Sequence, residues 1–126
     1  MKNTLCWMNM GSPDVEGSYE FYEQMFDWNM HKRHYGEKSM IEIDAGERSF
    51  AGISDTEAGE MPMWTPFVMV ENVQEFIDKA ESLGATIIYP RTQIDGGGAY
   101  AVFIDPQGAA LGVYEPSAQE VAAMLG

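Results

Sequence analysis

The sequence has few of the residues on which several classes of protein depend. Cys6 is its one cysteine, so an intrachain disulfide is impossible, and nothing points to an oxidising compartment. No uncharged apolar run approaches the roughly 20 residues that a membrane-spanning helix needs, and the first residues lack the long apolar stretch of a secretory signal. We therefore expect a soluble, cytoplasmic protein with no membrane partner.

Positive charge is also scarce. Seven Lys and Arg residues stand against 20 Asp and Glu residues, which gives a formal net charge of −13 at pH 7. Such a chain repels phosphate backbones and anionic lipid surfaces, so we expect no nucleic-acid partner. The acidity does not by itself predict a cationic ligand, because net charge also keeps a small protein in solution.

The length and the hydrophobic content suit one compact domain. The chain has 126 residues, 45% of them hydrophobic, which is enough for one core and too few for two ordinary independent domains. A weak internal repeat is visible, because an apolar strand near Trp7 and another near Trp64 each run into a segment of helical period. The two helical stripes are Val15, Tyr19, Tyr22 and Phe26, and Val73, Phe76, Ile77, Ala80 and Leu83.

Residues suited to begin and end these helices flank both stripes. Asp14 or Ser12 is a suitable N-cap for the first helix, and Asn72 is one for the second. Gly84 stands where a C′ glycine would end the second helix. Both stripes therefore predict short helices that pack on a neighbouring sheet.

Three strand-like runs follow each predicted helix, so the order is βαβββ twice. The runs cover residues 28–33, 40–44 and 49–54, and then 86–89, 100–104 and 109–114, with residues 105–108 as the final hairpin turn. A shift of sixty residues superposes 40–44 on 100–104 and keeps the strand alternation. We predict one α+β domain over residues 1–126. Its first module covers about 1–56, a polar linker about 55–62, its second module about 63–116 and a C-terminal helical tail about 117–126.

Three segments resemble a known family. They are Asp14 to Tyr22 with the surrounding "SYEFYEQMFDW", the segment "WTPFVMVENVQEFIDKAESLGATIIYP", and the hairpin "AYAVFIDPQGAALGVYEP". Together they resemble the vicinal-oxygen-chelate superfamily of glyoxalases, bleomycin-resistance proteins and extradiol dioxygenases, over nearly the whole chain. The resemblance implies two βαβββ modules that form cupped mixed sheets with helices on the outside.

The resemblance also implies four metal-binding positions, on the first and the last strand of each module. Counting back from the helix N-caps places the first-strand positions at Trp7 and Thr65. Counting on from the final turn places the last-strand position at Gly112, and the shift of sixty residues places its equivalent at Gly52. None of these four is an ordinary metal ligand. We therefore expect no metal there and assign the chain no cofactor.

Two other groups could carry chemistry. His31 and His34 would share a face on a helix, but on the strand and loop that we expect here they point to opposite faces. They are therefore a poor pair of metal ligands, and we interpret them as surface or hairpin histidines. Glu42 alternates with Ile41 and Ile43 and so faces away from both. It could act as a general base or hold an amine in a cleft, or it could be a solvent-facing strand residue.

A ligand-binding surface follows if the first-strand positions point inward, because strand alternation then adds further residues to the same face. The predicted ligand-binding residues are Trp7, Asn9, Glu42, Phe50, Gly52, Thr65, Phe67, Met69, Gly112 and Tyr114. They form a mainly apolar and aromatic set with a few polar groups, which is typical of a small-molecule site. The same side chains could instead fill the core or a dimer interface.

Three functions remain open at this point. The first is a metal-free cleft that sequesters or senses a small organic molecule, as the resemblance to bleomycin-resistance proteins implies. The second is a lyase, isomerase or oxidoreductase of the glyoxalase or dioxygenase type, with a non-standard metal site or with Glu42 as its base. The third is a domain whose cleft is closed by a partner protein.

We also expect a homodimer. The aromatic and Met-rich positions near strand ends and in the linker would be hard for a monomer to cover, and exposed apolar patches tend to be interaction surfaces. These positions are Trp28, Tyr35, Trp64 and residues 61–63.

Overall fold

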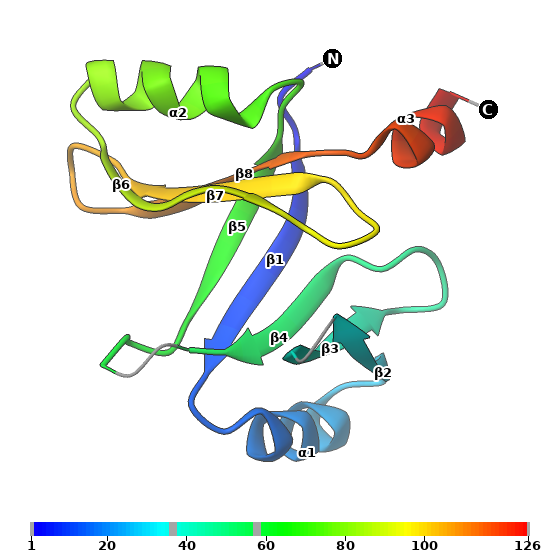
Figure 1. Ribbon diagram of the computed structural model, residues 1–126. Coiled ribbons are helices and arrows are strands. Elements are labelled where there is room, and N and C mark those ends of the chain that lie inside the picture. Colours follow the sequence, from blue (N-terminus) through cyan, green and yellow to red (C-terminus); the bar gives the residue numbers. More distant parts are fainter. Residues whose placement is uncertain (1, 36–37, 57–58, 126) are drawn as a thin grey trace. The chain divides into compact units, whose positions relative to one another are not determined.

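The computed structural model describes residues 2–35, 38–56 and 59–125. Within these residues eight strands and three helices follow one another in the order βαβββ twice, with a last helix after the second run (Figure 1). The predicted α+β class and the repeated βαβββ order are confirmed. None of the helices in the described ranges combines the length and the apolar character needed to span a membrane.

The chain forms two compact units. We call Trp7–Thr65 the first unit, and the chain from Pro66 onward, together with the segment that ends at Cys6, the second unit. The start of the chain groups with the second unit because it is hydrogen-bonded to Met69. The Asn3 Nδ2 atom donates to the Met69 carbonyl at 3.0 Å, and the Met69 amide donates to the Thr4 carbonyl at 2.8 Å.

The first unit contains a four-stranded mixed sheet in the order β2-β3-β4-β1. Its elements are β1 (Leu5–Ser12), α1 (Val15–Met25), β2 (Asn29–Tyr35), β3 (Lys38–Asp44) and β4 (Ala51–Asp55). Strands β2, β3 and β4 pair antiparallel, and β4 pairs parallel with β1. Residues 56–62 then lead to β5, and positions 57 and 58 of the predicted linker lie outside the described residues.

The core of the first unit lies between α1 and its sheet. Its fully buried side chains are Ile41, Ile43, Ala51 and Ile53. The predicted helical stripe is confirmed for Val15, Tyr19 and Tyr22, which pack against this cluster. Phe26 follows the last helical residue and is 45% exposed, with its ring stacked 6.4 Å from that of Tyr22.

The start of α1 is held by two side chains. The Asp14 carboxylate accepts a hydrogen bond from the Gly17 amide at 3.0 Å, so Asp14 is the N-cap. Ser12 is buried, and its hydroxyl accepts from the Asp14 amide at 3.1 Å and pairs with the Ser18 hydroxyl at 2.7 Å. Both residues considered for the cap therefore act at this helix end, in different roles.

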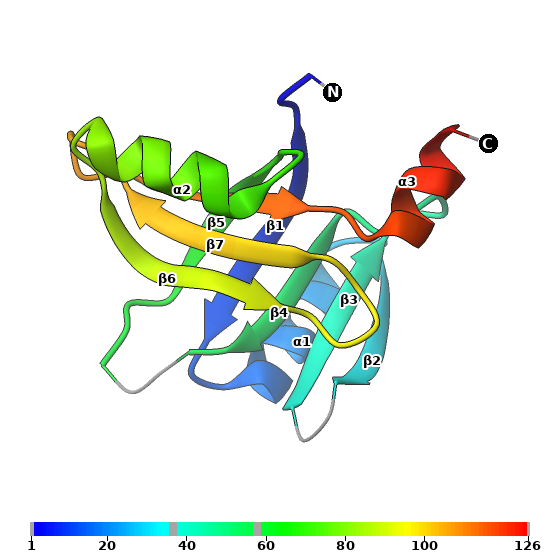
Figure 2. The ribbon, with the colours of Figure 1, turned by 45° about the horizontal axis from the view of Figure 1, so that its top comes forward.

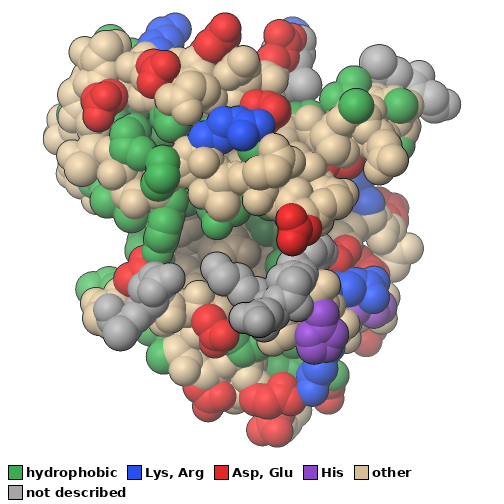
Figure 3. Space-filling model, in the orientation of Figure 1, with side chains coloured by type: hydrophobic (Ala, Val, Ile, Leu, Met, Phe, Trp, Pro, Cys, Tyr) green, Lys and Arg blue, Asp and Glu red, His purple; other side chains and the backbone are tan. Residues whose placement is uncertain are grey.

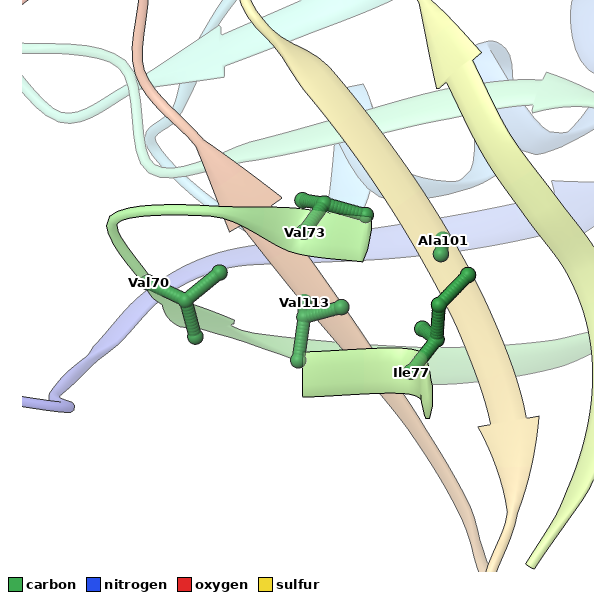
Figure 4. Packing of buried hydrophobic residues seen from close by; sticks show 5 residues of the cluster. All are labelled: Val70, Val73, Ile77, Ala101 and Val113. Atoms are coloured by element: carbon green, nitrogen blue, oxygen red, sulfur yellow. The ribbon is translucent and has the colours of Figure 1, made fainter. Parts of the chain in front are cut away.

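The second unit repeats this arrangement with its sheet in the order β5-β8-β7-β6. Its elements are β5 (Met63–Met69, which begins in the first unit), α2 (Val73–Ser82), β6 (Thr86–Gln93), β7 (Ala99–Ile104), β8 (Ala110–Glu115) and α3 (Ala118–Leu125). Strands β5 and β8 pair parallel, and the other neighbours pair antiparallel. Helix α2 runs along one face of this sheet (Figure 2) and covers a core that Figure 4 shows from close by. That core consists of Val70, Val73, Ile77, Ala101 and Val113.

Both ends of α2 are as the sequence predicts. Asn72 accepts from the Glu75 amide at 3.1 Å as the N-cap. Gly84 has a φ of +101°, which favours glycine. The Gly84 amide donates to the Glu81 carbonyl at 3.1 Å and the Ala85 amide donates to the Ala80 carbonyl at 3.0 Å. This pair of bonds is a Schellman motif.

The predicted strand ends agree with the observed ones to within two residues, except in β6. We expected that strand to end at Tyr89, but it continues for four more residues to Gln93. Pro90 lacks an amide proton, yet β6 is the last strand of its sheet, and an edge strand tolerates proline. The pairing with β7 shifts its register on both sides of Tyr89.

The final hairpin turn is also where we expected it. The Asp105 carboxylate accepts hydrogen bonds from the Ala109 amide at 3.0 Å and from the Gln107 amide at 2.8 Å. These bonds stabilise the ionised form and lower the pKa of Asp105. Gly108 supplies a positive φ of +97° within the same turn.

The core of the second unit can be tested with a matched pair of substitutions. Ile77→Ala removes a side chain that is 4% exposed, whereas Ile88→Ala removes one that is 45% exposed. We expect the first change to lower the free energy of unfolding by about 2–5 kcal/mol, because it leaves a cavity, and the second to lower it by less than about 1 kcal/mol. Chemical denaturation of both variants measures the difference, and equal losses would contradict the packing described.

Candidate functional site

The ten predicted ligand-binding residues divide between the two units. The first unit holds Trp7, Asn9, Glu42, Phe50, Gly52 and Thr65. The second unit holds Phe67, Met69, Gly112 and Tyr114.

In the first unit an aromatic ring lies against Gly52. Gly52 pairs with Asn9 of β1 and with Glu42 of β3. A Cβ atom at Gly52 would lie 2.9 Å from Cζ2 of Trp7 and 2.5 Å from Cε of Met40, closer than real Cβ atoms approach other heavy atoms. The half-buried Trp7 ring and Met40 therefore fill the space that a side chain at position 52 would need.

Polar groups lie beside this ring on the same face of the sheet. Strand alternation places Asn9, Glu42 and Ser54 opposite to the buried side chains that pack under α1. The Asn9 Nδ2 atom donates to the Ser54 hydroxyl at 3.0 Å. This face thus combines an indole ring with an amide, a hydroxyl and a carboxylate.

The Glu42 carboxylate is already held by two donors. The Ser49 hydroxyl donates to its Oε1 atom at 2.6 Å, and the Arg33 Nε atom donates to its Oε2 atom at 3.3 Å. The side chain of Glu42 is 22% exposed and that of Arg33 is 50% exposed. Glu42 does face away from Ile41 and Ile43, and its remaining lone pairs can accept a hydrogen bond from a ligand.

Phe50 and Thr65 differ from the other predicted residues of the first unit. Strand β4 begins at Ala51, so the alternation that leads back from Gly52 does not extend to Phe50. The Phe50 ring packs against the core cluster under α1, and its centroid lies 5.5 Å from that of Trp28. Phe50 is therefore a core side chain in this structure. Thr65 is half-buried in β5, two residues before Phe67.

The two histidines lie on β2, as expected. The His31 Nε2 atom is 2.8 Å from an Asp44 carboxylate oxygen, while His34 is exposed. The Asn29 side chain, the Gly46 amide and His31 all bond to Asp44 and lower its pKa to about 2. These contacts fix the end of the β2–β3 pair, and the histidines do not converge.

The four metal-binding positions that the family resemblance implies do not suit a metal ion. Trp7 and Thr65 offer no imidazole or carboxylate, and the space beside both glycines is filled by rings. Across residues 2–35, 38–56 and 59–125, no three or more His, Cys, Asp or Glu side chains are grouped so that they could hold one.

In the second unit Gly112 is covered in the same way. Phe67 of β5 pairs with Gly112 of β8, and a Cβ atom at Gly112 would lie 2.7 Å from Cγ of Phe67 and closer still to the ring edge. Phe67 is 7% exposed, and its ring meets that of Tyr100 in a T-shaped contact with centroids 6.2 Å apart. A ring thus replaces a side chain at this glycine too.

Tyr114, like its cross-strand neighbour Tyr100, is a phenol on this aromatic face. It pairs with Met69 on one side and with Tyr100 on the other. Its hydroxyl donates to the Glu120 carboxylate at 2.6 Å and accepts from the Gly98 amide at 3.3 Å. Burial, together with the hydrogen bond and the charge of Glu120, raises the pKa of Tyr114 well above its usual value.

Several residues of these faces were missed from the sequence. Met40 follows from the same alternation that gave Glu42, so the signal was available. Tyr100 lies two residues before Val102, which pairs with Gly112, so it points to the same face as Val102. Glu120 had no comparable signal, because its contact with Tyr114 depends on how the C-terminal helix packs.

Two surface grooves lie elsewhere in the units. One, of about 360 Å³, lies beside α1 and is lined by residues that include Met10, Phe21 and Tyr22. The other, of about 240 Å³, lies between α2 and the second sheet, with Phe76 and Leu83 in its lining. Neither is lined by any of the ten predicted ligand-binding residues.

Comparison with known proteins finds similar sequences and similar solved structures. The anthracycline biosynthesis proteins DnrV from Streptomyces peucetius and DauV from a Streptomyces strain are each 25% identical over 96% of the chain. The chain spans 50% of the length of each of them. A hypothetical protein from Bacillus halodurans has the same fold with a TM-score of 0.68 and 12% identity, covering 93% of this chain and 96% of that one.

A larger enzyme contains the fold as a part. A variant of homoprotocatechuate 2,3-dioxygenase from B. fuscum matches with a TM-score of 0.60 and 19% identity over 92% of this chain and 33% of its own. The sequence model of the Glyoxalase/Bleomycin resistance protein/Dioxygenase superfamily matches residues 4–113, which is most of the chain. The chain therefore belongs to the Glyoxalase/Bleomycin resistance protein/Dioxygenase superfamily.

Proposed function

We propose that this chain binds a small organic molecule with an aromatic part on one of two sheet faces, around Trp7 in the first unit or around Phe67 in the second, without a metal at the positions that the family resemblance implies. The observation that carries the proposal is the packing of a ring against each of the two glycines. Where a metal-binding relative would need a carboxylate, this chain has an aromatic ring, which is half-buried at Trp7 and 7% exposed at Phe67. Aromatic rings bind ligands by stacking and by burial of apolar area.

The composition of the two faces supports this role. Around Phe67 the neighbours are Met69 and the phenol rings of Tyr100 and Tyr114, whose two hydroxyls are polar. Around Trp7 the polar groups are few and are held in fixed positions by hydrogen bonds. Small-molecule sites combine mainly apolar walls with a few placed polar groups.

The names of the Streptomyces relatives suggest where to look for a ligand. Those two proteins are named for anthracycline biosynthesis, and anthracyclines contain fused aromatic rings. A fused aromatic ring system is therefore a reasonable first probe for this chain, which spans half of each relative. Sequestering or sensing such a molecule requires no catalytic residue.

Catalysis is the second candidate. The observation in its favour is that Glu42 lies on the same face as Trp7, with lone pairs that remain available to a ligand. A lyase, isomerase or oxidoreductase of the glyoxalase or dioxygenase type would then use Glu42 as a base, or a metal at other positions. Substitution of Glu42 by Gln separates the candidates, because an enzyme that needs this base loses turnover, whereas a binding site keeps an amide oxygen that still accepts a hydrogen bond from the ligand.

The metal content can be measured directly. We expect purified protein, loaded with Zn²⁺, Ni²⁺, Mn²⁺ or Fe²⁺ and then desalted, to retain far less than one equivalent, because the four inherited positions offer no ligand set. Elemental analysis provides the number. Roughly one equivalent of a single metal per chain, lost on substitution of residues next to Trp7 and Gly52, would contradict the expectation.

The role of Trp7 can be tested with 1-naphthol as a fused-ring probe. We expect Trp7→Ala to weaken binding about tenfold, since an aromatic contact contributes about 0.5–1.5 kcal/mol beyond the area it buries. Trp28→Phe is the matched control, because Trp28 packs within the core cluster of the first unit. Isothermal titration calorimetry on both variants gives the affinities. Equal affinities for the wild type and Trp7→Ala would remove Trp7 from the site.

We also propose a homodimer, although the surface that supports it differs from the one expected. Trp28 and Trp64 are packed within the first unit and so are not an exposed patch, and the side chain of Tyr35 lies outside the described part. The exposed large apolar side chains of this unit lie on α1, just after it, just before β5 and at the start of β5. They are Phe21 at 57%, Met25 at 56%, Phe26 at 45%, Met61 at 76% and Met63 at 45% exposed.

The oligomeric state tests this proposal. In moderate salt, which screens the repulsion between acidic chains, light scattering should give twice the calculated 14.0 kDa. Phe21→Glu should shift the mass to that of one chain, whereas Leu83→Glu, at a side chain of the second unit that is 69% exposed, should not. A single-chain mass for the wild type across micromolar concentrations would defeat the proposal.

A further inference from the structure

The C-terminal helix α3 begins with a reciprocal pair of hydrogen bonds. The Glu120 amide donates to the Ser117 hydroxyl at 3.1 Å, and the Ser117 amide donates to the Glu120 carboxylate at 3.0 Å. This is a capping box, which by itself only stabilises the start of a helix. Here the same carboxylate oxygen also accepts the Tyr114 hydroxyl proton at 2.6 Å. The capping box therefore joins α3 to a residue of the aromatic face.

This contact limits what the Tyr114 hydroxyl can offer to a ligand. A phenol has one proton to donate and two lone pairs that accept. The proton is used by Glu120, and one lone pair is used by the Gly98 amide at 3.3 Å. Toward a molecule on the aromatic face, Tyr114 is left with a lone pair only.

The surroundings of the hydroxyl keep it in this arrangement. A Cβ atom at Gly98 would collide with the backbone carbonyl of Glu115, so the loop before β7 lies directly against the end of β8. Burial and the Glu120 charge raise the pKa of Tyr114, so the hydroxyl keeps its proton, in the bond to Glu120, to a higher pH than an ordinary tyrosine does.

We propose that Glu120 is a positioning residue that makes Tyr114 a hydrogen-bond acceptor only, so that the site selects aromatic ligands that carry a hydroxyl or N–H donor. The inference rests on the proposed function, because it names the class of ligand for that same face. The half-buried Met69 contacts the ring system, and the Tyr114 hydroxyl accepts a hydrogen bond from the donor at its edge. A ligand that offers only an acceptor there, such as an ether oxygen, faces the lone pair of the Tyr114 hydroxyl. Neither oxygen then has a hydrogen-bond donor, which costs binding free energy.

Two probes of nearly equal shape test the proposal. 1-Naphthol can donate a hydrogen bond, whereas 1-methoxynaphthalene can only accept one. We expect the wild-type chain to bind the naphthol about tenfold more tightly, which is the scale expected for one hydrogen bond that is satisfied in one complex and unpaired in the other. In Tyr114→Phe this preference should fall to about equal affinities, because the acceptor is gone.

Glu120→Ala should increase the affinity for 1-methoxynaphthalene, which a purely structural role of Glu120 would not produce. Without Glu120 the Tyr114 proton is free to donate to the ether oxygen, so the affinity for 1-methoxynaphthalene should rise while the preference for the naphthol falls. Ser117→Ala is the matched control, because it removes a capping bond from the same helix and leaves the Tyr114 contact in place. That variant should keep the wild-type preference.

A second measurement needs no ligand. Ultraviolet absorbance between pH 9 and 13, recorded for the wild type, Glu120→Ala and Tyr114→Phe, identifies the tyrosine that ionises last. Removal of the Glu120 charge should lower the pKa of Tyr114, and Ser117→Ala should change it little. An unchanged titration in Glu120→Ala would overturn the assigned contact, whether or not any probe binds.

The outcomes separate the two proposals. If neither probe binds the wild type, the proposed function fails for fused aromatic rings and the inference fails with it. If both bind and Tyr114→Phe keeps the wild-type preference, the proposed function stands and the inference is wrong. Loss of the preference in Ser117→Ala as well would assign the effect to the placement of α3 and not to Glu120.

Discussion

The structure depends most on one repeated contact, the packing of an aromatic ring from a parallel neighbouring strand against a glycine of the last strand. Trp7 lies against Gly52, and Phe67 lies against Gly112. Glycine has no Cβ, so each ring can lie directly on the backbone. A carboxylate at either glycine would displace the ring and lose its packing. The ring and a metal ligand therefore exclude one another at each position.

The two faces built around these contacts differ in chemistry. In the first unit the neighbours of the ring are charged or polar, and they satisfy one another, as in the bonds of Glu42 with Ser49 and Arg33. In the second unit the neighbours are Met69 and two tyrosines, and the Tyr114 hydroxyl is bonded to Glu120. The two βαβββ modules therefore share one backbone arrangement but carry surfaces of different polarity. The fold is shared across a superfamily, but the chemistry is a property of these particular side chains.

The sequence predicts features that depend on local interactions. The N-caps Asp14 and Asn72, the C′ glycine Gly84 and the helical stripes need only neighbours within a few residues. Features that depend on where a strand begins or what packs on it were harder to predict. Phe50 turns into the core because β4 starts one residue after it, and Glu120 reaches Tyr114 only through the packing of α3. The periodicity of the sequence predicts neither the orientation of Phe50 nor the contact between Glu120 and Tyr114.

The distribution of charge bears on the kind of ligand that the aromatic faces suit. The chain carries a net charge of −13, and Figure 3 shows acidic side chains dispersed over one side of the molecule. On the face beside Trp7, however, Glu42 is paired with Arg33 and Asp44 is paired with His31. Arg33 offsets the charge of Glu42, and many other acidic side chains lie elsewhere, for example the exposed Glu20 and Glu23 along α1. A strongly acidic protein can in this way present a face on which a carboxylate is offset by a cation, and the ligand need not be a cation.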